Sequence, residues 1–252
     1  MIDLGIKDAF ILAGGKGERA KSISPDTQKV MIVSGTVVVS NTSAEVSGEK
    51  PNLWWNIELM RRYSIKRVIL GVGHMAEKVE EYFNDGKTIG IEIIYSKEKE
   101  PLGTGGALKN AERYLNKGTF FMMNGDELKD FDLGAMLAVH RKNKAIATIA
   151  LVEVDDVSSF GIADIEGERI NRFVEKPNKE EAPSNLANAG LYILEPEAFN
   201  YIPQGKSSIE RDVFPKIAES GRLFGFIAKG QWFPTDDKDR HERAQREWKG
   251  FR

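Results

Sequence analysis

The sequence has no cysteine and only three histidines among its 252 residues. Without cysteine, the chain cannot form disulfides, thiolate metal sites or a cysteine nucleophile. The histidines His74, His140 and His241 lie too far apart in sequence to suggest a local metal-binding motif. These absences favour a reducing environment, so we expect a cytoplasmic location.

The chain also lacks an excess of charge of either sign, and it lacks long apolar runs. With 36 Lys and Arg against 38 Asp and Glu, the formal net charge is -2. This balance provides no basic field for nucleic acid and no polybasic segment for an anionic membrane. No stretch approaches the roughly eighteen apolar residues of a membrane span, and the first residues lack a signal-peptide layout. We therefore expect small molecules or proteins as partners, with no nucleic acid and no membrane.

The composition is that of an ordinary globular protein, 41% hydrophobic and 29% charged, and it predicts one large domain. The first half alternates strand-like and helix-like stretches, as in a series of βαβ units. Its strands are near-continuous apolar runs, which is typical of a parallel sheet covered by helices on both faces. The expected strands are residues 8–13, 66–72, 90–95 and 119–123, and the expected helices are residues 52–64, 76–84 and 105–115.

The second half changes to consecutive short strands with glycine and proline between them. In open α/β sheets, ligands bind beyond the carboxyl ends of the strands. The loops after Ala13, Met123 and Val174 are therefore expected to face one shared crevice. The elements expected in this half are strands at residues 145–154, 160–165, 170–175 and 190–194 and a sheet-packing helix at residues 208–220.

The first of these loops is glycine-rich and follows the first buried strand directly, with the sequence LAGGKGER at residues 12–19. Its three glycines let the backbone approach a phosphate closely and turn N–H groups inward. Lys16 and Arg19 add positive charge. The loop therefore predicts an anion site.

Two other nucleotide-binding signatures fit this loop less well. The spacing Gly15-x-Gly17-x-x-Ala20 matches the dinucleotide fingerprint, but that fingerprint needs a long crossover helix and Pro25 arrives within two turns. The chain also contains no Walker phosphate-binding motif. A nicotinamide enzyme and a Walker ATPase are thus both disfavoured.

The second loop is Asn124-Gly125-Asp126-Glu127, which follows an apolar strand. A carboxylate that emerges there suits Mg²⁺, which binds one or two carboxylates, keeps several waters and bridges substrate phosphates. Simple turn chemistry explains the same residues equally well.

The third loop is Glu175-Lys176-Pro177, where the proline stops a strand. The lysine can neutralise a substrate phosphate and the glutamate can accept sugar hydroxyls, although such a tripeptide alone usually marks a solvated turn. A further glycine-rich stretch, residues 101–106, opens the helix at Gly105. Its N–H groups could meet a base, a ribose or a phosphate, or the stretch could be a flexible connection.

In this order and at these separations, the loops resemble those of the sugar-1-phosphate nucleotidylyltransferases, and the match covers most of the chain. The resemblance implies a three-layer Rossmann-like α/β fold with a mixed, mostly parallel sheet. It also implies Mg²⁺-dependent transfer of a nucleotidyl group from a nucleoside triphosphate to a sugar 1-phosphate, with release of pyrophosphate. One domain over residues 1–252 would divide into a nucleotide-binding half, about 1–125, and a sugar-phosphate-binding half, about 126–252. The matching segments are LAGGKGER, Lys29, PLGTGGALK, NGD, Phe160-Gly161, EKP, NAGLYIL and residues 232–244.

The same resemblance assigns roles to individual residues. The family's second metal aspartate normally lies two residues after the tryptophan of the last motif, where this chain has Pro234. Asp236 lies four residues after Trp232, a spacing similar to that in glucose-1-phosphate cytidylyltransferases, and it takes that role here. The implied roles are nucleotide binding by Leu12, Ala13, Gly14, Gly15, Gly17, Gly103 and Thr104, catalysis by Arg19, Lys29 and Lys176, sugar-phosphate binding by Gly161, Glu175, Lys176 and Asn188, and metal binding by Asp126 and Asp236.

Besides Pro234, the chain departs from the family's pattern in three further places. Glu18 stands where the family usually has threonine, and Val30 replaces the usual proline. A stretch near residues 36–48 is inserted, and we predict a hairpin over residues 37–46 that turns across Ser40 to Ser43. The insertion is either surface decoration or a lid or subunit contact, so a homo-oligomer stays open.

These departures keep a second hypothesis open, namely a catalytically weak regulatory subunit that binds nucleotide sugars. The nucleotide is open as well. Residues 21–26 resemble heptose-1-phosphate guanylyltransferases, whereas Leu53-Trp54-Trp55 and the position of Asp236 are closer to cytidylyltransferases. The sequence therefore favours GTP or CTP.

Overall fold

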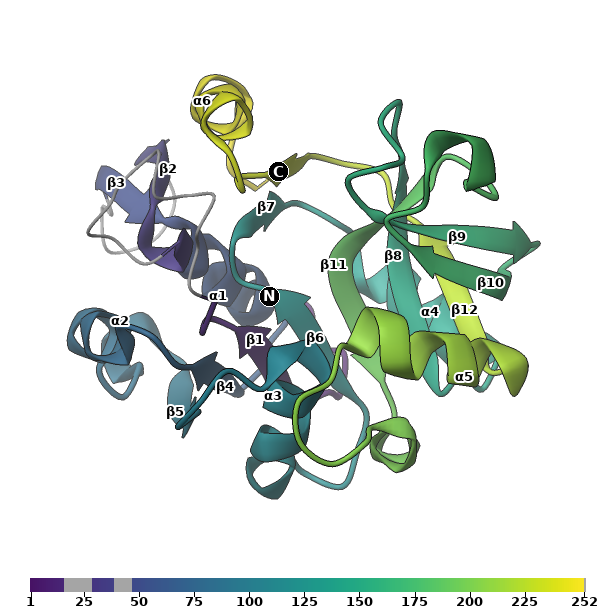
Figure 1. The fold of residues 1–252 in the computed structure, drawn as a ribbon. Coiled ribbons are helices and arrows are strands. Elements are labelled where there is room, and N and C mark those ends of the chain that lie inside the picture. Colours follow the sequence, from purple (N-terminus) through teal and green to yellow (C-terminus); the bar gives the residue numbers. More distant parts are fainter. Residues whose placement is uncertain (16–28, 39–46, 252) are drawn as a thin grey trace.

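The computed structural model of the chain describes residues 1–15, 29–38 and 47–251, with residues 29, 34–38 and 47–49 described as backbone only. Within these residues, nine strands form one sheet in the order β5-β4-β1-β6-β11-β8-β12-β10-β9. Figure 1 shows this sheet running through the centre of the molecule.

The first four strands of this order are the parallel part of the sheet. They are β5 (Glu92–Lys97), β4 (Arg67–Val72), β1 (Asp8–Leu12) and β6 (Phe120–Asn124), and each pairs with the next in parallel. These are the four strands expected from the apolar runs of the first half. Their bounds differ from the expected ones by two residues at most, as at β5.

The other five strands continue the sheet with two reversals of direction. Two of them, β11 and β10, run against the remaining seven strands, because β11 is antiparallel to β6 and β8 while β10 is antiparallel to β12 and β9. The mixed, mostly parallel sheet is therefore confirmed. The five strands are β11 (Leu186–Leu194), β8 (Ala147–Glu153), β12 (Leu223–Ile227), β10 (Arg169–Glu175) and β9 (Gly161–Glu166).

Alternate residues of the central strands point to opposite faces, and this alternation builds two cores. Ile11 packs into one apolar cluster with α1, α2, α4 and α6, whereas Phe10 packs into the other with α3 and α5. Helices thus cover both faces, which is the three-layer arrangement expected from the sequence (Figure 1). The helices are α1 (Asn52–Arg62), α2 (Ala76–Phe83), α3 (Gly103–Ala111), α4 (Leu133–Lys142), α5 (Phe214–Glu219) and α6 (Lys238–Glu247).

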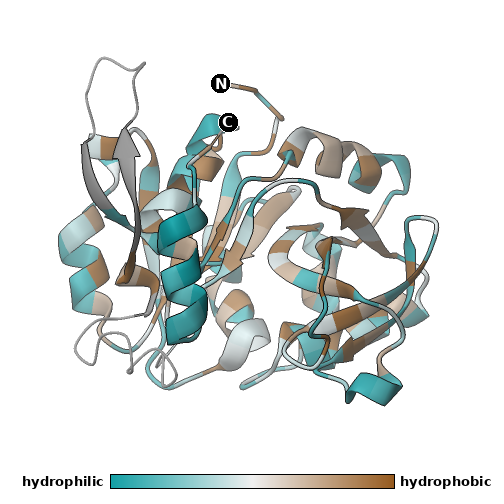
Figure 2. Ribbon diagram, turned by 90° about the horizontal axis from the view of Figure 1, so that it is seen from above, coloured by the Kyte–Doolittle hydropathy of each residue, from teal (hydrophilic) through white to brown (hydrophobic). Residues whose placement is uncertain are grey.

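The hydropathy of each element follows its place in these layers. Figure 2 shows hydrophobic colours along the strands and a strongly hydrophilic α6. The sequence of α6, KDRHERAQRE, buries only His241 and Ala244. No helix among the described residues is long and apolar enough to cross a membrane.

The helix expected at residues 208–220 is divided into two parts. Ile209–Val213 is a π-helical segment, and α5 begins only at Phe214. Pro215 has no N–H, so an unbroken ladder of helical hydrogen bonds cannot run through this position. The strand expected at residues 190–194 is longer than expected and begins at Leu186.

Two small sheets complete the fold. β2 (Val33–Val38) and β3 (Ser47–Pro51) are antiparallel, and Val38 pairs with Ser47. Most of the hairpin expected over residues 37–46, including its turn at Ser40 to Ser43, lies outside the described residues, and Val37 pairs with Gly48 rather than with residue 46. β7 (Glu127–Lys129) pairs with β13 (Trp232–Pro234) and brings the last motif of the sequence beside the loop after β6.

A buried ion pair anchors the start of β1. The carboxylate of Asp8, with 3% of its side chain exposed, accepts hydrogen bonds from Arg67 at 3.1 and 3.0 Å and from the Asn116 N–H at 2.7 Å.

We predict that Asp8→Ala lowers the free energy of unfolding by about 3 kcal/mol, because it leaves a half-buried guanidinium without its partner. Urea unfolding followed by tryptophan fluorescence measures this loss. The exposed pair Asp85–Lys87 provides the control, because Asp85→Ala should leave the midpoint unchanged. Equal effects of the two variants would contradict the prediction.

Candidate active site

Two adjoining cavities lie at the carboxyl ends of β1 and β6. The first, about 570 Å³, is lined by the loop after β1 and by the start of α3. The second, about 270 Å³, is lined by residues of the loops after β6, β8, β10 and β13. Four residues belong to both walls, namely Thr104, Asn124, Asp126 and Glu210. The expectation that the loops after Ala13, Met123 and Val174 face one crevice is therefore confirmed.

The loop after β1 is fastened to β4 by its backbone. The Ala13 N–H donates to the Gly71 carbonyl at 2.8 Å. A Cβ on Gly14 would lie 3.0 Å from the Gly73 nitrogen, whereas one on Gly15 would meet no atom of the described residues within 4 Å. Gly14 therefore packs closely against the backbone of Gly73, and both glycines line the first cavity.

Part of the predicted phosphate site lies outside the described residues. Gly17 and Arg19 belong to this part, as does Glu18. Lys29 begins a short 3-10 helix (Lys29–Met31), of which its backbone alone is described. Val30, in place of the family's proline, is 5% exposed and lines the first cavity.

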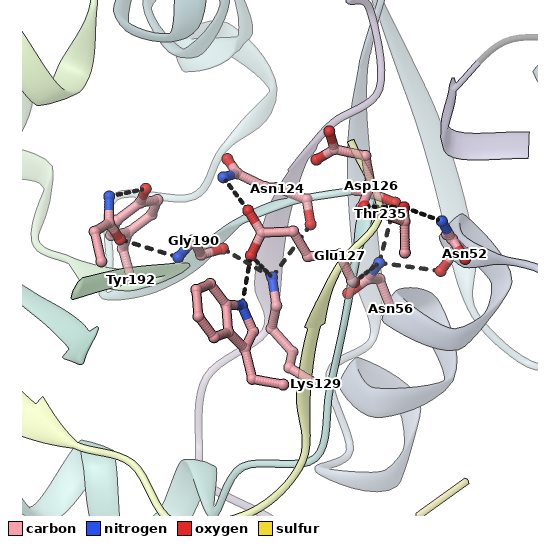
Figure 3. A network of polar contacts seen from close by, with 12 residues as sticks. Asn52, Asn56, Asn124, Asp126, Glu127, Lys129, Gly190, Tyr192 and Thr235 are labelled. Atoms are coloured by element: carbon pink, nitrogen blue, oxygen red, sulfur yellow. Dashed lines mark hydrogen bonds and ion pairs between the residues drawn. The ribbon is translucent and has the colours of Figure 1, made fainter. Parts of the chain in front are cut away.

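The loop after β6 is fastened to β1 in the same way. The Gly125 N–H donates to the Leu12 carbonyl at 3.0 Å, and a Cβ on Gly125 would lie only 2.6 Å from that oxygen. Asp126 follows immediately, lines both cavities, and its carboxylate points away from the polar contacts beneath the loop (Figure 3).

Three consecutive carbonyls of this loop are held by side chains from distant elements (Figure 3). The buried amide of Asn56 donates to the Gly125 and Glu127 carbonyls at 3.1 and 2.9 Å. The Thr235 hydroxyl donates to the Asp126 carbonyl at 2.6 Å. Thr235 accepts in turn from the amide of Asn52 at 2.8 Å. The loop that presents Asp126 is thus held on its inner side along its whole length.

A buried ion pair lies beneath this loop. The Lys129 side chain has no exposed surface, and its ammonium lies 3.1 Å from the Gly190 carbonyl and 3.5 Å from a Glu127 carboxylate oxygen. Glu127 also accepts from the Trp232 indole at 2.8 Å and from the Asn124 amide at 3.0 Å. Burial lowers the pKa of Lys129, and the Glu127 carboxylate opposes that shift. The hydrogen bond from Lys129 to the Gly190 carbonyl joins β7 to β11 under the crevice.

The start of α3 packs tightly against residues 205–209. Gly103 has a φ of +72°, and a Cβ there would lie 2.4 Å from the Ser207 carbonyl oxygen. The N–H groups of Gly105 and Gly106 both donate to this oxygen, at 2.9 and 3.3 Å. Of the N–H groups in residues 101–106 that could have met a ligand, those of Gly105 and Gly106 are therefore occupied by Ser207. Gly103 and Thr104 do line the first cavity, as expected.

Glu175 and Lys176 lie on the wall of the second cavity. The Lys176 ammonium is 3.9 Å from a Glu175 carboxylate oxygen, and Lys176 has a φ of +52°, which non-glycine residues rarely adopt. Burial raises the pKa of Glu175, and the nearby Glu210 carboxylate adds to this shift. A Cβ on Gly161 would lie 2.8 Å from a Glu175 oxygen, so glycine is needed for this carboxylate to keep its place.

Asn188 lines the second cavity, but its amide also has internal partners. It donates to the Tyr192 hydroxyl and accepts from the Gly190 N–H, both at 2.9 Å. Gly190 has a φ of +61°, and a Cβ there would lie 2.5 Å from the Asn124 amide nitrogen. Asn188 therefore stabilises the turn that makes room for Asn124.

The last motif brings Asp236 to the second cavity. Pro234 pairs with Glu127 in the β13–β7 ladder, and Pro234, Thr235 and Asp236 all line the second cavity. The Asp236 carboxylate accepts from Arg240 at 2.8 Å, and Arg240 also lies 3.5 Å from Asp237. The position two residues after Trp232 is thus a paired strand residue, and the carboxylate on the cavity wall comes from the position four residues after it.

Several residues of the site were not singled out in the sequence. Glu210 lies between the two cavities and accepts from the hydroxyls of Thr104 at 2.7 Å and Ser208 at 2.6 Å. Its segment was interpreted only as a sheet-packing helix. Asn52 and Asn56 lie one turn apart on α1, and both are buried. Two asparagines at this spacing in an otherwise apolar stretch are a sequence signal for buried amides that hydrogen-bond to another element.

Several solved structures share the fold of this one. UDP-glucose pyrophosphorylase complexed with UDP-glucose has a TM-score of 0.80 at 23% identity, covering 96% of this chain and 98% of that chain. HddC from Yersinia pseudotuberculosis complexed with GMP-PN has a TM-score of 0.75 at 29% identity, covering 97% of this chain and 100% of that chain. The fold is therefore of the nucleotidyltransferase class.

Sequence comparison gives the family. A model of the nucleotidyl transferase family matches residues 8–239, and the chain belongs to this family. It is 34% identical over 229 residues to a mannose-1-phosphate guanylyltransferase of Mycobacterium tuberculosis, covering 89% of this chain and 60% of that protein. It is 37% identical over 232 residues to a UTP–glucose-1-phosphate uridylyltransferase of Synechocystis, covering 86% of this chain and 56% of that protein. The chain thus spans less than two thirds of the length of these relatives.

The raised pKa of Glu175 predicts a pH dependence of stability. The folded protein binds this proton more tightly than the unfolded chain, whose ordinary pKa is 4.5. The resulting stabilisation is complete below the unfolded pKa and is lost as the pH rises through the folded one. The unfolding free energy of the wild type minus that of Glu175→Gln should therefore fall as the pH rises above 4.5 and through the raised pKa of Glu175 in the folded protein.

Urea unfolding of both proteins at several pH values measures this difference. Glu166→Gln is the matched control, because the Glu166 side chain is 75% exposed. A wild-type-minus-Glu175→Gln difference that stays constant or increases with pH would contradict the assignment.

Proposed function

We propose that this chain transfers a nucleotidyl group from a nucleoside triphosphate to a sugar 1-phosphate and releases pyrophosphate. The observation that carries the proposal is the pair of adjoining cavities, which share Asp126 on their common wall. The glycine-rich loop borders one cavity and Lys176 borders the other. Two substrates bound side by side would therefore meet at Asp126. The names of the relatives agree with this reaction.

The first cavity is proposed to bind the nucleotide. Its volume of about 570 Å³ lies within the ordinary range of small-molecule sites. Leu12, Ala13 and Gly14 bring the backbone to its edge, and Gly15, which lines it as well, would bring its N–H to a phosphate. Gly103 and Thr104 border the opposite wall, where the nucleoside would lie. Most of these residues come from the half of the chain up to about residue 125.

The second cavity is proposed to bind the sugar phosphate. Lys176 would hold the phosphate, and Glu175 would accept sugar hydroxyls beside Gly161 and Asn188. The unusual φ of Lys176 supports a role for its side chain, because strained backbone persists where function or packing requires it. These residues belong to the half after about residue 126.

No protein nucleophile is needed in the proposed mechanism. An oxygen of the sugar phosphate attacks the α-phosphorus in line, and the chain contributes positioning and charge. Gly14, Gly15 and Gly17 would hold the triphosphate through backbone N–H groups, while Arg19 and Lys29 would balance its charge. Holding both substrates in near-attack geometry contributes about 7 to 11 kcal/mol.

Mg²⁺ is proposed as the cofactor, with Asp126 and Asp236 as its protein ligands. The described residues contain no group of three or more His, Cys, Asp or Glu side chains that could hold a metal ion. Two carboxylates on the wall of one cavity nevertheless fit Mg²⁺, which takes only one or two from the protein and completes its shell with waters and phosphates. When bound, Mg²⁺ would stabilise negative charge on the phosphate oxygens. Arg240 holds one oxygen of Asp236 and so orients that carboxylate.

The identity of the substrates is proposed at the level of classes. The names of the relatives favour guanosine or uridine triphosphate with mannose or glucose 1-phosphate. The complex of HddC with GMP-PN also favours a guanine nucleotide. The position of Asp236 keeps CTP among the candidates.

The direct test is pyrophosphate release from the purified protein with Mg²⁺, each of GTP, UTP, CTP, dTTP and ATP, and a panel of hexose and heptose 1-phosphates. We expect release with one pair and a loss of about 100-fold or more in Asp126→Asn, because one of the two proposed Mg²⁺ ligands is removed. Asp85→Asn, an exposed change of the same kind, should keep full activity. If the folded wild type released no pyrophosphate with any pair and still bound a nucleotide sugar tightly, the result would contradict the proposed enzyme and support the regulatory binding protein.

A second prediction separates the two cavities. Lys176→Met should raise KM for the sugar phosphate by about tenfold to a hundredfold, because a hydrogen bond to a charged group is lost. KM for the nucleoside triphosphate should change much less. Lys179→Met, at an exposed position in the short helix Lys179–Glu181, is the control. An equal rise in both KM values would contradict the assignment of Lys176 to the sugar phosphate.

A further inference from the structure

We infer that Thr235 is a positioning residue whose hydroxyl sets the placement of Asp126 relative to Asp236. The inference rests on the proposed function, in which these two carboxylates hold the metal ion. Thr235 immediately precedes Asp236 in the chain, and it contacts Asp126 although 109 residues separate them in sequence. A single side chain thus connects the two segments that supply the carboxylates.

The contact is short and fully enclosed. The Thr235 hydroxyl donates to the Asp126 carbonyl at 2.6 Å, and neither Thr235 nor Asn52 has any exposed surface. Figure 3 shows Thr235 between the Asp126 backbone and Asn52. Water therefore cannot replace this hydrogen bond if the hydroxyl is removed, and the Asp126 carbonyl would be left without its buried donor.

Asn52 determines the direction of the hydrogen bond. Its amide nitrogen donates to the Thr235 oxygen at 2.8 Å, and an amide nitrogen cannot accept. The single hydroxyl proton of Thr235 is therefore directed to the Asp126 carbonyl. The amide oxygen of Asn52 has no hydrogen-bond partner among the described residues. The hydrogen bond to Thr235 is therefore the polar contact that holds this buried side chain.

The neighbouring side-chain hydrogen bonds hold the carbonyls on either side of Asp126 and leave the Asp126 carbonyl to Thr235. Asn56 holds the carbonyls on either side, those of Gly125 and Glu127, and Thr235 holds the Asp126 carbonyl between them. On the other strand, Pro234 pairs with Glu127, which brings Thr235 beneath the loop. Arg240 then holds the Asp236 carboxylate from the outer side at 2.8 Å.

A small change in the separation of the two carboxylates has a large effect on the proposed metal site. Mg²⁺ demands near-ideal octahedral geometry, and functional sites tolerate displacements of only about 0.5 Å. Loss of the Thr235 hydroxyl should therefore weaken metal binding more than it weakens the fold. A purely structural role would instead lower stability and leave metal affinity unchanged.

The test compares Thr235→Val, which keeps the shape and removes the hydroxyl, with Thr235→Ser, which keeps the hydroxyl. Thr148→Val is the matched control, because Thr148 is equally buried, its hydroxyl contacts His140 at 2.8 Å, and it lines neither cavity. Mn²⁺ binding to each protein without substrates is measured by electron paramagnetic resonance, and thermal unfolding is recorded in parallel.

Thr235→Val is expected to weaken Mn²⁺ binding by about tenfold, whereas Thr235→Ser and Thr148→Val stay within about twofold of the wild type. The Mg²⁺ concentration for half-maximal transfer should rise in the same proportion. Asn52→Ala is the second variant, and it should act in the same direction because the hydroxyl proton is no longer directed to Asp126. Combined with Thr235→Val it should add nothing, since both changes act through one hydrogen bond.

The outcomes separate this inference from the proposed function. Mn²⁺ affinity that is equal in the wild type and Thr235→Val, or lost equally in Thr235→Val and Thr148→Val, overturns the inference even if the wild type is an active transferase. A wild type that binds no Mn²⁺ overturns it as well. Weaker Mn²⁺ binding in Thr235→Val alone supports it even if no substrate pair is turned over. If Thr235→Val does not fold, Asn52→Ala and Thr235→Ser decide by the same measurements.

Discussion

The hydrogen bond between the Gly125 N–H and the Leu12 carbonyl is the constraint on which the site depends. It joins the loops that follow two neighbouring parallel strands, and the absence of a side chain at Gly125 allows the backbones to touch. Because Gly14 packs against Gly73 in the same way, the ends of β4, β1 and β6 form one continuous backbone surface. The cavity wall is consequently made by the sheet itself, and its shape follows from the register of the strands.

A second layer of polar side chains supports this surface from below. Asn56, Thr235 and Lys129 belong to α1, the segment after β13 and β7, and each donates to a backbone carbonyl near the crevice. Donors that are buried beside carbonyls stabilise the loop without taking up the carboxylate of Asp126. Lys129 also offsets the charge of Glu127, so the carboxylates of the crevice have a buried positive partner.

The sequence was sufficient to predict the strands and much of the crevice. A strand covered on both faces has to be apolar throughout, so runs such as residues 120–123 could be interpreted directly. Polar residues that end such strands, like Asp126 and Lys176, then had to lie at one edge of the sheet. The spacing of motifs therefore carried three-dimensional information.

Contacts between distant segments could not be predicted in this way. Glu210 follows Ile209 in a segment whose apolar spacing indicated only a packing helix, and its place between the cavities depends on how Ser208 and Thr104 meet. The partners of Asn52 and Asn56 depend on the pairing of β7 with β13, which joins parts of the chain about a hundred residues apart. A single sequence shows that such residues are polar, but it does not show what they face.

The contact between α3 and Ser207 has a consequence for how the chain can evolve. A Cβ at Gly103 or Gly105 would collide with Ser207, and one at Gly106 would collide with the Gly205 carbonyl. A larger residue at any of these three glycines therefore requires a shift of the segment around residues 205–207. We expect the start of α3 and residues 205–207 to covary among homologous sequences, because they are in contact.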